Sequence, residues 1–225
     1  MKKNIVWIFI SMFLVACVDL AGNQHAALKK MGYYSKTSSV KSSGSYKGDI
    51  YTMRGGLGIF STGMNQVRVA SRQRFGIPAS TIMWYHAGKV ARQILAKEQT
   101  RKEHQPVILI GHSLGANEQI KVARRLEQKG VNVDLLITVD AVSQTVVPAN
   151  VKQVLNIYKP GYVPMFSGLK LKAVNPEGTQ IENVNLDDLP EVKVNHFTMD
   201  RHQVVQEKIL ATIEKVLIHA KQKDV

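Results

Sequence analysis

A serine between two glycines stands at the centre of this sequence, in the pattern G-x-S-x-G of Gly111-His112-Ser113-Leu114-Gly115. The preceding residues, 106–110, are aliphatic and β-branched, which is typical of a short buried strand. The following residues carry an apolar stripe at helical spacing. A tight turn between a strand and a helix holds a serine in a strained backbone conformation and exposes its hydroxyl group. The pattern therefore predicts that Ser113 is a nucleophile.

The geometry of the turn also explains the residue types on either side of this serine. Side chains at Gly111 and Gly115 would collide where the strand and the helix close on each other, so both elbow positions need glycine. The start of the helix directs backbone N–H groups at the site, where they stabilise a developing oxyanion. We therefore expect the N–H of Leu114, the residue after the nucleophile, to be one oxyanion donor.

This segment resembles the nucleophile elbow of the α/β-hydrolase superfamily, on its lipase, esterase and thioesterase side. The resemblance extends from about Asp49 to about Leu217. It implies a serine hydrolase that cleaves carboxylic esters or thioesters through an acyl-enzyme, with the triad in the chain order Ser, acid, His. It also implies a second oxyanion donor in the loop after an early strand, at Gly56 or Leu57.

Three histidines follow the serine and are candidates for the general base: His196, His202 and His219. His196 precedes the last predicted helix, in the loop where the superfamily commonly carries its histidine. His202 falls in the first turn of that helix, where we expect it to face solvent. His219 lies near the helix end, where a cation is favourable. We therefore predict that His196 is the base.

The acid has more than one candidate. Asp140 stands at the carboxyl end of the strand that follows the elbow helix, and chemistry in open α/β sheets gathers at that edge. Most superfamily members carry the acid one strand later, so this position resembles a minority arrangement. Asp187 and Asp188 are the alternatives, in a segment that equally fits an exposed acidic turn. Asp200 is expected to cap the last helix. We predict Asp140 as the acid.

Strand-like and helix-like patterns alternate along the chain, which implies a mostly parallel sheet covered by helices on both faces. We expect an α/β fold, an α/β-hydrolase-like three-layer sandwich. Because the segments between strands are short, no large cap domain is expected. The pattern predicts strands at 49–54, 81–85, 106–110, 131–139, 151–158 and 169–174, and helices at 64–75, 86–99, after 113 and at 203–221.

The first residues have the features of a bacterial lipoprotein signal. Lys2 and Lys3 precede a short apolar run, Ile5–Val15. The run ends in Leu14-Val15-Ala16-Cys17, which resembles a lipobox, so cleavage before Cys17 and lipidation of this residue are implied.

The lipobox resemblance divides the chain into three parts. Residues 1–16 are the predicted signal peptide, 17–47 a lipidated N-terminus with a flexible tether rich in Ser, Lys and Gly, and 48–225 the hydrolase domain. Val18 after the cysteine resembles the sorting signal of outer-membrane lipoproteins. We expect a lipid-anchored protein of the bacterial envelope, at the outer membrane facing the periplasm.

The composition limits the partners. The chain has 225 residues, a formal charge of +13 and a pI of about 9.8, but its basic residues are scattered and no nucleic-acid motif accompanies them. The single cysteine excludes an intramolecular disulfide and a cysteine-based metal site. No cofactor motif or metal spacing such as H-E-x-x-H is present, so no cofactor and no metal are expected. The expected partners are an acyl-ester substrate and, through Cys17, a membrane; a monomer is expected.

The hypothesis is therefore a serine hydrolase with an open site, acting on acyl esters or thioesters at the envelope. One alternative is a non-catalytic envelope lipoprotein that uses the fold for binding, in which Ser113, Asp140 and His196 do not converge or the oxyanion loop is collapsed. Another is an acyltransferase with the same triad, which only product analysis distinguishes from a hydrolase. The acyl and leaving groups do not follow from the sequence.

Overall fold

The structure of the protein is a computed structural model that describes residues 46–56 and 61–223. Its centre is a sheet of six strands, and every neighbouring pair in it is parallel. The strands are β1 (Asp49–Arg54), β2 (Ala79–Met83), β3 (Val107–His112), β4 (Val133–Val139), β6 (Val151–Tyr158) and β8 (Gln180–Asn185). Their spatial order is β2-β1-β3-β4-β6-β8.

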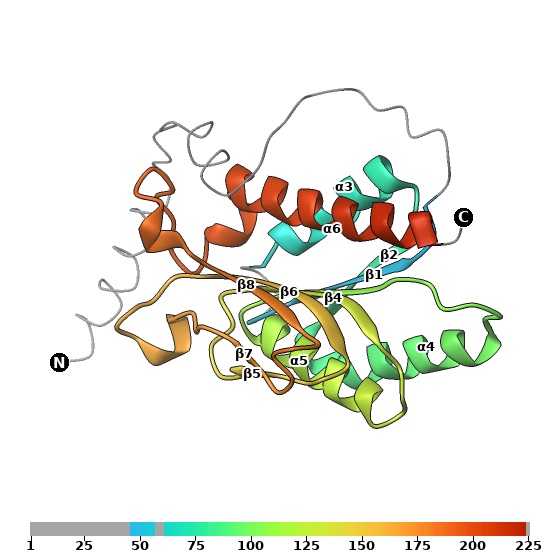
Figure 1. Ribbon diagram of the computed structural model, residues 1–225. Coiled ribbons are helices and arrows are strands. Elements are labelled where there is room, and N and C mark those ends of the chain that lie inside the picture. Colours follow the sequence, from blue (N-terminus) through green and yellow to red (C-terminus); the bar gives the residue numbers. More distant parts are fainter. Residues whose placement is uncertain (1–45, 57–60, 224–225) are drawn as a thin grey trace.

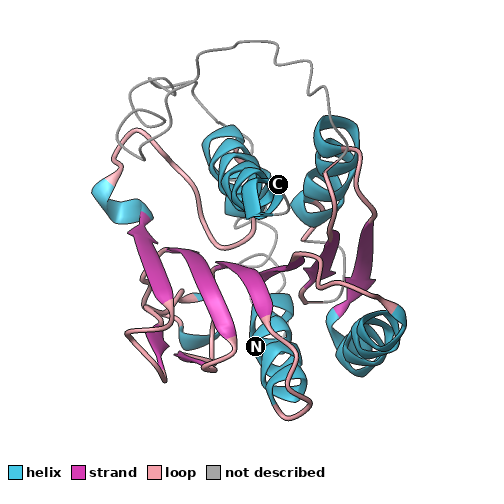
Figure 2. Cartoon of the chain, turned by 45° about the vertical axis from the view of Figure 1, so that its right-hand side comes forward, coloured by secondary structure: helices cyan, strands magenta, loops and turns pink. Residues whose placement is uncertain are grey.

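Two layers of helices cover the sheet (Figure 1). The helices α3 (Gly63–Phe75) and α6 (Gln203–Lys223) lie on one face, and α4 (Ala87–Thr100) and α5 (Leu114–Glu127) lie on the other. Each face has its own cluster of buried apolar side chains. Figure 2 shows the twisted sheet between the layers. The predicted three-layer sandwich is confirmed, and the described residues contain no large cap domain.

The central strands explain where the site forms. All residues of β3 and β4 are buried, as their continuous aliphatic sequence predicts for strands covered on both faces. In the register between them, His112 is paired with Val139. The next residue of each strand, Ser113 and Asp140, therefore leaves the sheet at the same edge.

The largest differences from the prediction lie between β6 and α6. The expected strand 169–174 is reduced to β7 (Lys172–Ala173), which pairs with β5 (Val146–Val147) in a separate small sheet. The edge strand β8 was not predicted, because its sequence is mostly polar and its side chains are partly exposed. The described part of the chain also contains four short 3-10 helices: η2 (Trp84–His86), η3 (Pro164–Phe166), η4 (Leu186–Asp188) and η5 (Met199–Arg201).

The predicted signal peptide, the lipidation site Cys17 and the tether as far as residue 45 lie outside the described residues. The tether's last two residues, Tyr46 and Lys47, are described, and the Tyr46 ring packs edge-on against Phe75 with 6.2 Å between the ring centroids. No helix within residues 46–56 and 61–223 has the length and apolar character needed to span a membrane.

Asp200 was expected to cap the last helix, and this prediction is wrong. Its Oδ2 atom accepts a hydrogen bond of 2.8 Å from the N–H of Gly63, the first residue of α3. A Cβ atom at Gly63 would overlap the backbone of Asp200, so this close approach requires glycine. Burial raises the pKa of Asp200 to about 6. The carboxyl group thus joins α3 to the segment before α6.

The raised pKa makes a prediction about stability. The ordinary pKa of this carboxyl group is 3.8, so the folded state binds the proton more tightly than the unfolded state does. The contribution of this carboxyl group to the free energy of unfolding must then fall as the pH rises from about 4 to about 6. In Asp200→Asn this contribution is absent, although an acceptor for Gly63 remains. The wild type should lose up to about 3 kcal/mol relative to the variant over this range.

Urea unfolding of both proteins at several pH values between these limits measures this difference. If the gap between the two proteins does not change with pH, the assignment of the titration to Asp200 is wrong.

Candidate active site

Ser113, His196 and Asp140 meet in one chain of hydrogen bonds at the carboxyl edge of the sheet. The Nε2 atom of His196 lies 2.8 Å from Ser113 Oγ, and its Nδ1 atom lies 2.7 Å from Asp140 Oδ2. Because a carboxylate only accepts, Nδ1 carries the proton and Nε2 accepts from the serine hydroxyl. This is the arrangement of a nucleophile, a base and an orienting acid. The binding-protein alternative predicted either no such convergence or a collapsed oxyanion loop. The three side chains do converge, whereas residues 57–60 of that loop lie outside the described residues.

The backbone at the ends of β3 and β4 is strained in the same sense. Ser113 has φ 57° and Asp140 has φ 53°, and they are the two non-glycine residues with positive φ in the described part of the chain. A Cβ atom at Gly111 would overlap the backbone of Gly115, and one at Gly115 would overlap the carbonyl group of Met53 in β1. A larger side chain therefore does not fit at either elbow position.

Asp140 is held on every side. It is fully buried, and its N–H donates to the carbonyl oxygen of Ile157 at 2.8 Å. Its Oδ1 atom accepts from the N–H of Lys159 at 2.8 Å, while Oδ2 faces His196. A Cβ atom at Gly168 would overlap Oδ1, so only glycine fits beside the acid. Gly168 was not anticipated from the sequence.

The other candidates lie elsewhere. Asp187 and Asp188 are exposed in η4, and the Asp187 carboxylate pairs with the side chain of Lys159. His202 was expected to face solvent, but it is 7% exposed. His219 lines a separate pocket near the end of α6. In the part of the chain that the structure describes, no group of three or more His, Cys, Asp or Glu side chains is arranged to hold a metal ion.

Asn117 is a further residue that the sequence argument missed. It lies in α5, one turn after Ser113, and is buried. Its Oδ1 atom accepts from three successive N–H groups in the loop after Asp140, at 3.1, 3.2 and 3.2 Å, those of Val142, Ser143 and Gln144. One side chain on the nucleophile's helix therefore shapes the loop after the acid. A buried asparagine at this helical spacing was the available signal.

The expected oxyanion donors lie around the elbow. Leu114 is the first residue of α5, so its N–H has no acceptor within the helix. The Gly55 backbone packs against the elbow so closely that a Cβ atom there would come within 2.9 Å of Leu114 N. Gly56 follows with φ 54°, and its carbonyl oxygen accepts from Trp84 Nε1 at 2.7 Å. Leu57, the other predicted donor, lies outside the described residues.

His112 connects the loop after β1, which contains Gly55 and Gly56, to the loop that carries His196. Its ring is buried, Nε2 donates to the carbonyl oxygen of His196 at 2.8 Å, and Nδ1 lies 2.8 Å from Ser61 Oγ. Because the carbonyl group only accepts, Nε2 carries the proton and Nδ1 accepts from Ser61. The Ser61 Oγ atom accepts in turn from the N–H of Gly55 at 3.1 Å. A continuous chain of hydrogen bonds therefore runs from the oxyanion loop to His196.

The charge state of His112 suits this role. Burial, together with the nearby imidazole of His196, lowers the pKa of His112 to about 3. The ring is therefore neutral at physiological pH and keeps one donor and one acceptor. The sequence argument placed His112 at the variable position of the elbow and gave it no role.

His112→Phe keeps a ring but leaves the Ser61 hydroxyl and the His196 carbonyl group without their buried partner. We expect kcat for ester hydrolysis to fall at least about tenfold with KM nearly unchanged, since losing one partner of a buried hydrogen bond costs about 1–3 kcal/mol. His112→Gln, which can still donate to His196, should recover part of the rate. Steady-state kinetics on folded protein, checked by circular dichroism, measures both. Equal kcat in the wild type and His112→Phe would contradict a positioning role.

Comparison with known proteins agrees with this geometry. Residues 67–155, which include Ser113 and Asp140, match the family model described as a thioesterase domain. No curated protein matches the chain.

Solved structures similar to the chain include three thioesterases. The NocB thioesterase domain of the nocardicin cluster has a TM-score of 0.48 and 12% identity over 77% of this chain and 95% of its own. The RedJ thioesterase of the Streptomyces coelicolor prodiginine pathway has a TM-score of 0.45 and 11% identity over 75% of this chain and 90% of its own. The type II thioesterase BorB of the borrelidin cluster has a TM-score of 0.43 and 13% identity over 76% of this chain and 92% of its own. The family match confirms the resemblance to the thioesterase side of the α/β-hydrolase superfamily and the expected enzyme class, a hydrolase of ester or thioester bonds.

Proposed function

We propose that the protein is a serine hydrolase that cleaves acyl esters or thioesters with Ser113, His196 and Asp140 as its triad. The observation that carries the proposal is the unbroken hydrogen-bond chain from Ser113 Oγ through both ring nitrogens of His196 to Asp140. The strained turn that holds Ser113 between β3 and α5 supports it independently.

The geometry supports the following reaction steps. Ser113 Oγ attacks the carbonyl carbon of the substrate while His196 Nε2 takes the hydroxyl proton, and Asp140 stabilises the resulting imidazolium. The N–H group of Leu114 and that of Gly56 or Leu57 bind the oxyanion. His196 then gives the proton to the oxygen or sulfur of the leaving group, which departs and leaves an acyl-enzyme. Water attacks this ester with His196 again as the base, and the free acid and Ser113 are regenerated.

Apolar side chains beside the base favour substrates with an apolar acyl group. The rings of Phe166 and Phe197 each lie 5.4 Å from the His196 ring, and 5.0 Å from each other. Phe166 belongs to η3, and neighbouring residues of the same segment are exposed and apolar: Tyr162, Val163 and Met165. An exposed apolar surface next to His196 suits an acyl chain more than a charged group. In a panel of esters, longer acyl chains should be cleaved faster than acetyl.

We also propose that the protein acts as a monomer anchored at the bacterial envelope. The support for the anchor is the lipobox-like sequence that ends at Cys17. Loss of Lys2 and Lys3 with the signal peptide lowers the formal charge from +13 to 13 − 2 = +11, which still suits a surface near anionic envelope material. Membrane fractionation of the full chain and of Cys17→Ser tests the anchor, and only the wild type should stay with the outer membrane.

Labelling by a fluorophosphonate probe tests the proposed nucleophile. The wild-type full chain should label, Ser113→Ala should not, and His196→Ala should label at least about 100-fold more slowly, because a general base contributes about 10²–10⁴ in rate. Ser143→Ala removes a different serine hydroxyl near the site and serves as the matched control, which should label like the wild type.

Labelling of folded Ser113→Ala, or no labelling of the folded wild type, would contradict the assignment. Product analysis with an alcohol acceptor present then separates hydrolysis from acyl transfer.

A further inference from the structure

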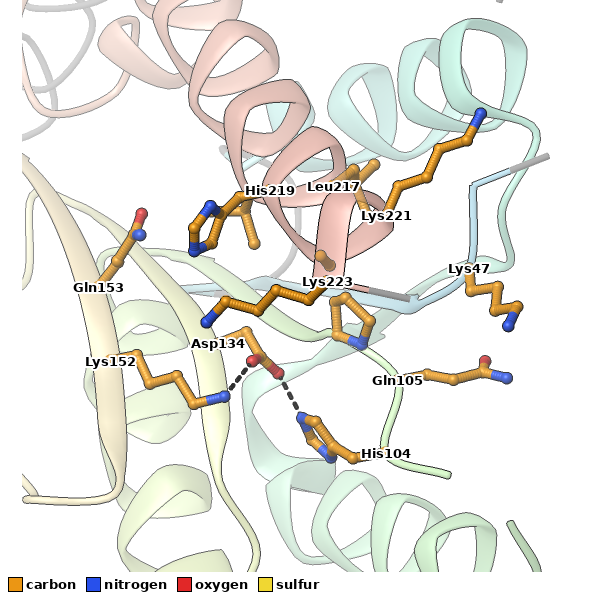
Figure 3. A pocket seen from close by; sticks show the side chains of 13 residues that line it. Lys47, His104, Gln105, Asp134, Lys152, Gln153, Leu217, His219, Lys221 and Lys223 are labelled. Atoms are coloured by element: carbon orange, nitrogen blue, oxygen red, sulfur yellow. Dashed lines mark hydrogen bonds and ion pairs between the residues drawn. The ribbon is translucent and has the colours of Figure 1, made fainter. Parts of the chain in front are cut away.

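A second pocket lies at the opposite edge of the sheet from the triad. It has a volume of about 420 Å³ and includes Pro106, the residue before β3, whereas Ser113 follows the end of that strand. The six residues of β3 separate the two sites by about 20 Å. The basic residues around the pocket come from separate segments of the chain (Figure 3): Lys47, His104, Lys152, His219, Lys221 and Lys223.

One acidic residue, Asp134, lines this pocket, and its carboxylate is already occupied. Its Oδ1 atom accepts from Lys152 Nζ at 2.7 Å, and its Oδ2 atom accepts from His104 Nε2 at 2.8 Å and from the N–H of Val107 at 2.9 Å. Burial opposes ionisation of Asp134, but these hydrogen bonds hold its pKa below the ordinary value. The hydrogen bond to Asp134 raises the pKa of His104, which favours its charged form. The lining therefore keeps an excess of positive charge.

The neighbouring acids among residues 46–56 and 61–223 do not cancel this excess. Glu98 bonds to Arg101 and to the Nδ1 atom of His104, and Glu103 lies 3.9 Å from Lys47 on the exposed surface. Lys223 forms no ion pair with a carboxylate among the described residues. Figure 3 shows its side chain extending towards Lys152 and Asp134.

The helix dipole alone does not explain this cluster. Lysines at the end of α6 complement the negative helix terminus, and Lys221 also lies over the Tyr46 ring at 5.9 Å. Lys152 and His104, however, lie on β6 and on the loop before β3. The same cavity has an apolar part formed by Pro106, Val216, Leu217 and Ala220. A basic rim beside an apolar wall is the surface that an anion with an apolar portion would recognise.

We propose that this pocket binds a phosphate-bearing ligand, with the phosphate group at Lys152 and Lys223 and an apolar portion against the apolar part of the lining. Lysine ammonium groups bind phosphate as compact charges with rotatable donors. The phosphate group can belong to a free metabolite or to a lipid headgroup. The pocket includes Lys47, where the predicted tether enters the domain, so an anchored protein would carry it close to the anchored end of the chain. The site is independent of the proposed catalysis.

Phosphate binding by the full chain tests the proposal. The Cys17→Ser background prevents lipidation, and isothermal titration at low ionic strength with glycerol phosphate measures the affinity. Lys152→Gln/Lys223→Gln should weaken binding about fivefold, because two positive charges that face the phosphate group are lost. Lys89→Gln/Lys129→Gln removes two exposed lysines outside the pocket and is the control with the same net charge. Its affinity should equal that of the unchanged background.

Lys223→Gln alone spares the partners of Asp134 and keeps the test valid if the double variant unfolds. The proposal is overturned if the background protein does not bind glycerol phosphate, or if the pocket and control variants bind equally.

Vesicles distinguish the two sources of phosphate. The same proteins are sedimented with phosphatidylcholine vesicles, with and without phosphatidylglycerol. Extra sedimentation on anionic vesicles that the pocket variant loses and the control keeps supports a headgroup ligand. Glycerol phosphate binding without this variant-sensitive sedimentation supports a free ligand. Equal sedimentation loss in both variants, together with equal glycerol phosphate affinity, shows attraction by general surface charge and overturns the site.

Discussion

The hydrogen bond between His196 Nδ1 and Asp140 Oδ2 is the interaction on which the proposed chemistry depends. It decides which ring nitrogen carries the proton and leaves Nε2 free to accept from Ser113. The bond can form because two neighbouring parallel strands end in register, so that the nucleophile and the acid leave the sheet side by side. In this placement both residues adopt a strained backbone conformation with a positive φ.

The surrounding residues keep this geometry through contacts from several elements. Asn117, on the helix of the nucleophile, fixes the loop after the acid, and Gly168 lets the chain pass directly beside the carboxylate. His112 and Ser61 join the oxyanion loop to the backbone of the base. A rigid arrangement of this kind supplies oriented dipoles before the substrate arrives, which is how enzymes stabilise a charge that develops during the reaction. The neutral state of His112 is part of this design, since a charged ring beside His196 would oppose the imidazolium.

Local sequence patterns were enough to predict most of the fold. The sheet, the helix layers and Ser113 follow from strand-turn-helix periodicity, and Asp140 was found because it ends a buried strand. Asp200 was assigned to the wrong helix, because its partner Gly63 is 137 residues away and no local pattern records such a contact. The roles of His112, Asn117 and Gly168 were missed for the same reason. The strand β8 was missed because a polar edge strand lacks the apolar alternation that identifies strands.

The most direct test of the proposed triad is which aspartate acts as its acid, Asp140 or the alternative Asp187. The measurement is kcat/KM for ester hydrolysis by Asp140→Asn and Asp187→Asn, compared with the wild type. Loss of the orienting carboxylate should lower the value about 10⁴-fold, because the base then adopts the wrong tautomer. Asp187→Asn should stay within about twofold of the wild type, since exposed charges contribute little. A large loss in Asp187→Asn with an active Asp140→Asn would contradict the triad described here.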